Sequence, residues 1–199
     1  MIDLKQVPGA EAVGPFALTL AGALSNEDCQ AIIDCAGERL EQSGLLGTQR
    51  ENYRTSSGAW LRPNDLPEQV GKLRGIVSDI TGLPATHQES VQVLRYEVGQ
   101  EYREHQDFWH PNTDYYDAQM ERGGQRSWSV MVYLNTVEGG GGTGFPKLGL
   151  AVEAEEGKLL AWQNTIDGEL NYDSLHAGLP VTAGRKWVAV TWVREQPFT

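Results

Sequence analysis

Apolar residues recur at helical spacing in the first part of the chain. Ser25, followed three residues later by Asp28, can form a capping box, and the apolar stripe that follows predicts a helix ending before Ser43. A second apolar stripe predicts a helix from about Pro67 to Ile80. The N-terminal part, about 1–83, is therefore expected to be largely helical.

The pattern changes to period two after Pro84. Short segments rich in Val, Tyr and Trp are separated there by Gly, Pro, Asn and Asp, which is typical of strands and turns. This pattern predicts a mainly β (α+β) fold, a β-sandwich or jelly roll with the N-terminal helices packed outside. No linker divides the chain, so we expect a single domain over 1–199 with a jelly-roll core over about 84–199. The predicted strands are 90–98, 101–107, 127–135, 158–163, 172–176 and 186–194.

Charge and cysteine content narrow the function classes. The chain carries 16 basic and 27 acidic residues, a net charge of −11, and no basic block, which argues against nucleic-acid and anionic-membrane partners. No apolar run is long enough to span a membrane, and no secretory signal is evident. Cys29 and Cys35 are expected to point apart on one helix, which favours a reducing, cytoplasmic location. The sequence carries no signal for an oligomeric state.

Two connections stand out among the predicted loops. The glycine-rich stretch 136–149 lacks the Lys-Ser/Thr and the following helix of a nucleotide-binding loop. The long polar and aromatic stretch 108–126 fits a lid over a binding site, with Trp109, Tyr115 and Tyr116 as its aromatic side chains. His110 is assigned to this lid, and His87 is expected to be structural or solvated.

His105 and Asp107 form an H-x-D triplet at the end of a predicted strand. Side chains alternate along a strand, so both lie on one face, roughly 6.5–7 Å apart along the strand, and can converge on one ion. A third, neutral ligand must then come from another strand, and His176 is the candidate. Two imidazoles and one carboxylate form the facial arrangement of non-haem Fe(II) oxygenases. The triplet alone is also compatible with solvated or hydrogen-bonded side chains.

Lys186, ten residues after His176, begins the last predicted strand. Positions 188, 190 and 192 share its face and are apolar, and a lysine there is unfavourable unless it pairs with an anion. A dicarboxylate whose other end chelates the metal would be such an anion. The alternative is that Lys186 lies at the strand edge and reaches water.

Together these residues resemble the prolyl 4-hydroxylase branch of the Fe(II)/2-oxoglutarate-dependent dioxygenases, whose fold is a double-stranded β-helix. The resemblance extends from about Leu24 to Glu195. It is densest over VQVLRYEVGQEYREHQD (91–107), GGQRSWSVMVYLNTVEGGGGTGFP (123–146) and SLHAGLPVTAGRKWVAVTW (174–192).

The resemblance implies Fe(II), 2-oxoglutarate and O2 as cofactor and cosubstrates, with ascorbate as reductant. It also implies that the loop 54–61 covers a peptide groove. The implied iron ligands are His105, Asp107 and His176, the residues that hold 2-oxoglutarate are Lys186, Tyr96 and Thr143, and the residues around the substrate are Tyr102, Arg126 and Trp192.

The expected function is hydroxylation of a prolyl residue in a peptide or protein, with release of succinate and CO2. Two positions depart from the family pattern: Gly142 stands where an acidic residue is common, and Arg194 where peptide-acting members often have His. These departures leave open the same chemistry on a free amino acid or another small molecule. A non-catalytic metal-binding jelly roll is a further alternative, but such a module needs no buried lysine beside the metal.

Overall fold

Two antiparallel sheets form the centre of the computed structural model, which describes residues 7–42, 53–62 and 64–199. The major sheet has the order β1-β2-β11-β7-β16-β5-β4-β3, and the minor sheet the order β10-β9-β14-β6. The major-sheet strands are β1 (Ala10–Ala12), β2 (Ala17–Leu20), β3 (Glu41–Gln42), β4 (Ser57–Trp60), β5 (Gln92–Tyr96), β7 (Arg126–Tyr133), β11 (Leu159–Gln163) and β16 (Lys186–Arg194). Those of the minor sheet are β6 (Tyr102–His105), β9 (Thr143–Phe145), β10 (Leu150–Val152) and β14 (His176–Gly178).

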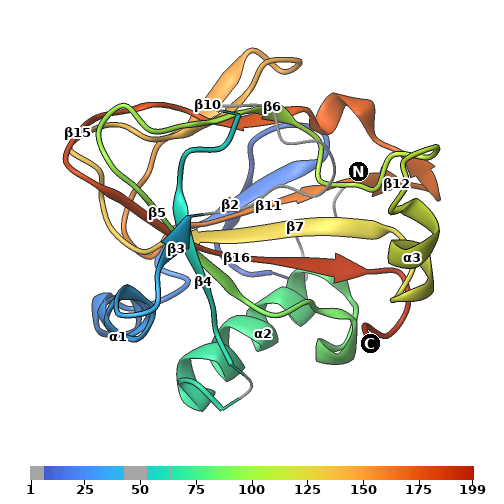
Figure 1. Cartoon of the computed structure of the whole chain (residues 1–199), viewed down its shortest axis with the longest axis horizontal. Coiled ribbons are helices and arrows are strands. Elements are labelled where there is room, and N and C mark those ends of the chain that lie inside the picture. Colours follow the sequence, from blue (N-terminus) through green and yellow to red (C-terminus); the bar gives the residue numbers. More distant parts are fainter. Residues whose placement is uncertain (1–6, 43–52, 63) are drawn as a thin grey trace.

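Two helices, α1 (Asn26–Gly37) and α2 (Pro67–Thr81), lie on the outer face of the major sheet, below it in Figure 1. The predicted capping box is present: the Ser25 hydroxyl accepts from the backbone N–H of Asp28, and the Asp28 carboxylate accepts from the backbone N–H of Ser25. Helix α1 ends at Gly37, earlier than predicted, because the chain turns there towards β3; Ser43 lies outside the described residues.

An apolar cluster fills the space between the two sheets, separate from the one beneath the helices. It comes from the inward-facing side chains of the major sheet and from Phe145 and Val152 of the minor sheet. The alternation predicted for β16 is confirmed, since Lys186, Val188, Val190 and Trp192 all line the cavity at this inner face. The two-sheet arrangement confirms the predicted jelly-roll class.

Three segments differ from the sequence-based expectation. The predicted strand 172–176 is wrong: Tyr172–Ser174 form a short 3-10 turn, and the strand begins at His176. The N-terminal part is not only helical, because it supplies β1 to β4 to the major sheet. The stretch 108–126 contains a short helix, α3 (Tyr116–Glu121), besides its loops.

There are two further short strand pairs, β8 (Gly139–Gly140) with β15 (Val181–Ala183) and β12 (Thr165–Ile166) with β13 (Glu169–Leu170), and a 3-10 helix at Ala85–His87. Among the described helices, none is both long and apolar enough to cross a membrane.

Candidate metal centre and its cavity

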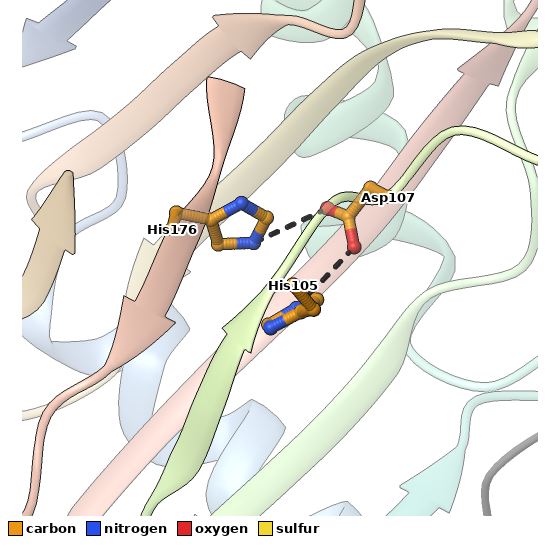
Figure 2. A group of neighbouring side chains, drawn as sticks. All are labelled: His105, Asp107 and His176. Atoms are coloured by element: carbon orange, nitrogen blue, oxygen red, sulfur yellow. Dashed lines mark ion pairs between the residues drawn. The ribbon is translucent and has the colours of Figure 1, made fainter. Parts of the chain in front are cut away.

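A cross-strand pair brings the two histidines of the predicted site together. His105 ends β6 and His176 begins β14, and the two residues are direct partners in the antiparallel register. Asp107 follows β6 two residues later, and its carboxylate faces both rings in Figure 2, with one oxygen towards each. One ligand atom from each residue lies within 4.8 Å of the others. The three predicted ligands therefore converge at the spacing expected for one bound ion.

Both imidazoles are oriented by backbone carbonyls. The Nδ1 atom of His105 lies 2.7 Å from the carbonyl oxygen of Arg103, and the Nδ1 atom of His176 lies 2.9 Å from that of Ser174. A ring that donates through Nδ1 keeps a lone pair on Nε2, the nitrogen that faces Asp107 in both residues. The local backbone thus selects the tautomer that a metal needs.

A buried polar chain fixes the Asp107 carboxylate. The Ser129 hydroxyl on β7 donates to Asp107 Oδ2 at 2.5 Å, and the Asn164 amide donates to Ser129 Oγ at 2.8 Å. Ser129 and Asn164 are fully buried. Because the serine oxygen already accepts from Asn164, its single proton is directed to the carboxylate.

The protonation states suit a divalent cation. Burial, together with the neighbouring His176, lowers the pKa of His105 to about 3. Burial alone would raise the pKa of Asp107, but His176, His105, Arg126 and the Ser129 hydrogen bond outweigh it and lower that pKa to about 2. At neutral pH His105 is therefore neutral and Asp107 ionised, the forms that coordinate metals.

Lys186 lies in the same cavity and is only 3% exposed. Its Nζ is 5.2 Å from the ring centre of Tyr96 and 5.5 Å from that of Tyr133, and no carboxylate among the described residues pairs with it. Burial lowers its pKa to about 7. The alternative that Lys186 reaches bulk water is excluded, and the side chain is placed to meet an anion inside the cavity.

Tyr96 and Thr143, the other residues expected near 2-oxoglutarate, both line this cavity. The Thr143 hydroxyl accepts from the Tyr133 hydroxyl at 2.7 Å. Burial raises the pKa of Tyr96, against the influence of Arg54 and Ser56 near its hydroxyl. Its ring faces Lys186, while its hydroxyl lies near Arg54 and Ser56. The expectation that 54–61 is a loop is wrong for most of this segment, because Ser57–Trp60 form strand β4, which pairs with β5.

The predicted substrate residues Tyr102, Arg126 and Trp192 also line this cavity. The Tyr102 ring stacks on His105 with ring centres 3.6 Å apart. The Arg126 guanidinium lies between two indoles, 3.9 Å from the ring centre of Trp192 and 4.2 Å from that of Trp109. These aromatic walls next to the metal ligands form a compartment for a small ring.

The cavity measures about 980 Å³, within the range of ligand pockets. Trp109 and Tyr115 of the lid line it, whereas Tyr116 is not among the described residues that do. His110 also lines it but is outside the three-residue cluster. His87 has a structural role, with Nδ1 3.0 Å from the carbonyl oxygen of Arg194.

The departure at Gly142 has a local structural reason. A Cβ atom at this position would lie 2.7 Å from the carbonyl oxygen of Val152 on β10. This close approach of two backbone segments leaves no room for an acidic side chain without a shift of β10.

Sequence reasoning missed three polar residues of the site: Ser129, Tyr133 and Glu89. Ser129 and Tyr133 share the inward face of β7, so alternation along the predicted strand 127–135 was a usable signal. Glu89, which pairs with Arg126 at 2.7 Å, precedes β5 in a segment without a regular pattern and gave no such signal.

Comparison with known proteins agrees with this geometry. Residues 91–194 match the family model of the 2OG-Fe(II) oxygenase superfamily. The chain is 34% identical to "Probable prolyl 4-hydroxylase 10" of Arabidopsis thaliana, over 92% of this chain and 70% of that protein. It is 34% identical to "Prolyl 4-hydroxylase subunit alpha-1" of Gallus gallus, over 87% of this chain and 34% of that protein. The 2-oxoglutarate complex of viral collagen prolyl hydroxylase from Paramecium Bursaria Chlorella virus-1 superposes with a TM-score of 0.73 at 29% identity, covering 91% of this chain and 97% of that one.

Proposed function

This chain belongs to the prolyl 4-hydroxylase family of 2OG-Fe(II) oxygenases, and we propose that it hydroxylates a prolyl residue in a peptide or protein. The chain is a dioxygenase that uses Fe(II) and 2-oxoglutarate. When bound, these groups supply the oxidising chemistry: O2 is consumed, 2-oxoglutarate yields succinate and CO2, and one oxygen atom enters a C–H bond of the substrate.

The residues have separate tasks in this proposal. His105 and His176 hold the iron through Nε2, and Asp107 holds it through its carboxylate, held in place by Ser129. The Lys186 ammonium binds the distal carboxylate of 2-oxoglutarate, because it is buried in the same cavity with no carboxylate partner among the described residues. That combination of a buried cation and the three-ligand cluster is the observation that carries the proposal.

The substrate proline is proposed to lie between Tyr102 and Trp192, beside the metal. Both side chains line the cavity, Trp192 buried and Tyr102 part-buried, so they are proposed to position the ring and exclude solvent. Arg126 is proposed to hold the peptide backbone of the substrate, because a guanidinium can donate to carbonyl oxygens and this one lies in the cavity between Trp109 and Trp192.

The test is turnover of a proline-containing peptide by the enzyme loaded with Fe(II) and 2-oxoglutarate. We expect a mass gain of one oxygen atom on the proline, with an equal amount of succinate. The same peptide with alanine in place of proline is the control. Hydroxylation of free amino acids but of no peptide would contradict the proposed substrate while leaving the cofactor assignment intact.

We also propose ascorbate as the reductant and a cytoplasmic location, both as expectations from the sequence. The two cysteines are free thiols in the structure, in keeping with a reducing compartment. Stimulation of turnover by ascorbate tests the first proposal, and fractionation of the native host cell tests the second.

A further inference from the structure

Two arginines, the buried Arg194 and the part-buried Arg126, share one carboxylate at the cavity. Arg126 donates from Nε and Nη2 to the two oxygens of Glu89 at 2.7 and 2.8 Å. Arg194 forms a second ion pair with the same group, Nε to Oε1 at 2.9 Å. Arg194 is fully buried, and Glu89 is 5% exposed. The group of three side chains therefore carries one positive charge in excess.

Arg194 is held in place by the lid as well as by Glu89. Its Nη1 donates to the carbonyl oxygen of Gly124 at 2.6 Å, and its Nη2 donates to Oε1 of Gln119 in α3 at 3.0 Å. These neutral acceptors bind the two Nη atoms but add no negative charge, so the one carboxylate of Glu89 faces both guanidinium groups. A buried charge without a counter-charge is unfavourable, and it indicates that an anion completes the group.

Arg126 presents that excess charge to the cavity. The two indoles cover its faces and Glu89 occupies one edge, while Nη1 has no hydrogen-bond partner among the described residues. Arg126 lines the cavity together with Glu89 and Trp192. A free guanidinium edge beside a proline compartment is a donor for a carboxylate of the substrate.

Other charged groups nearby do not cancel this excess. Asp107 belongs to the three-residue ligand cluster, where a bound cation would neutralise its charge. The Glu195 carboxylate accepts from the backbone N–H of Gln125 on the exposed side of the lid, where solvent screens it. Arg54 and Arg122 also line the cavity and add positive charge.

We propose that the substrate carries a carboxylate next to the hydroxylated proline, either from an acidic side chain or from a free C-terminus. This inference rests on the proposed prolyl hydroxylation and names its substrate class. It runs against the net charge of −11, which by itself would favour a basic or neutral peptide. Arg194 acts as a specificity-determining residue through Glu89 and Arg126, without touching the substrate.

The test compares peptides that differ only in charge. Three acetylated and amidated peptides carry Glu, Gln or Lys on both sides of one proline. A separate pair of peptides ends at the proline, one with a free carboxylate and one with an amide. We expect one carboxylate form to exceed its neutral partner about tenfold in kcat/KM, as for one charge-assisted hydrogen bond. The Glu and Gln peptides test for a side-chain carboxylate, and the pair that ends at the proline tests for a C-terminal carboxylate. Equal rates in both pairs, or a preference for Lys, would overturn the proposal.

Binding measured under argon, with Fe(II) and 2-oxoglutarate present, separates this inference from the proposed function. Without O2 there is no turnover, so the peptide Kd reports charge preference alone. Tighter binding of the carboxylate peptides without later hydroxylation would support the anion preference and contradict prolyl hydroxylation. Hydroxylation of the proline with no charge preference would support prolyl hydroxylation and contradict the anion preference.

Three variants assign the preference to Arg194. Arg194→His removes the excess charge at neutral pH and is expected to reduce the carboxylate-to-neutral ratio at least threefold. Arg194→Lys also disrupts the contacts with the lid but keeps the charge, so the ratio should persist. Arg39→His removes the same charge from a remote pair with Asp65 and should leave the ratio unchanged. A ratio that falls equally in the Lys and His variants would contradict the charge argument; should both variants unfold, the wild-type peptide series still decides the proposal.

Discussion

Ser129 offers the sharpest test of how the fold holds the metal. Its hydroxyl is buried, donates to Asp107 Oδ2 at 2.5 Å and accepts from Asn164. Ser129→Ala removes one hydrogen bond to a charged group, worth about 1.5–3 kcal/mol, and leaves the Asn164 amide without its acceptor. Loss of such a partner of a metal ligand typically weakens metal binding about 10–100-fold, or roughly 1.4–2.7 kcal/mol, so the two magnitudes agree.

The assay is calorimetric titration of the metal-free enzyme with Mn(II), which avoids the oxidation of Fe(II). Ser129→Thr keeps the hydroxyl and should restore most of the affinity. Ser127→Ala is the matched control, because it removes a hydroxyl on the same strand that donates to the carbonyl oxygen of Val193 instead. If Ser129→Ala is folded by circular dichroism and binds Mn(II) within a factor of about three of the wild type, the hydroxyl does not position Asp107 and the reasoning is wrong.

Three other outcomes follow from the same structure. Lys186→Met should stabilise the metal-free enzyme by about 1–3 kcal/mol in thermal unfolding, because it removes a buried ammonium without a carboxylate partner, and should also greatly weaken 2-oxoglutarate binding; a lower Tm would contradict this. The pKa of Lys186 is lowered to about 7, so its charge is present below that pH; wild-type affinity for 2-oxoglutarate should fall as the pH rises from 7 to 9, and titrations of Lys186→Met should lack that component. Gly157→Ala should lower Tm far more than Gly22→Ala: both have positive φ, but a Cβ at Gly157 would lie 2.4 Å from the carbonyl oxygen of Leu24, while Gly22 faces open space. Equal losses of Tm would refute the steric argument.

The sequence predicts the position of those site residues whose placement depends only on their spacing along one strand. His105 and Asp107 are two residues apart on one strand, and Lys186 begins an alternating strand, so each could be placed on a face before its neighbours were known. Glu89 could not, because its role depends on two arginines far along the chain. The predicted strand 172–176 failed because its first half folds into a 3-10 turn, where Asn171 caps the backbone N–H of Asp173.

His105 lies on the edge strand of the minor sheet, so metal binding at the site should change the local stability of that edge. Strand β6 is the outermost member of the minor sheet, and within the described part of the chain its backbone pairs, apart from β14, with the short segment Tyr53–Thr55. An ion bound to both histidines would act as a cross-link between β6 and β14. Amide hydrogens of this edge that exchange by local opening should therefore exchange more slowly as the free metal concentration rises.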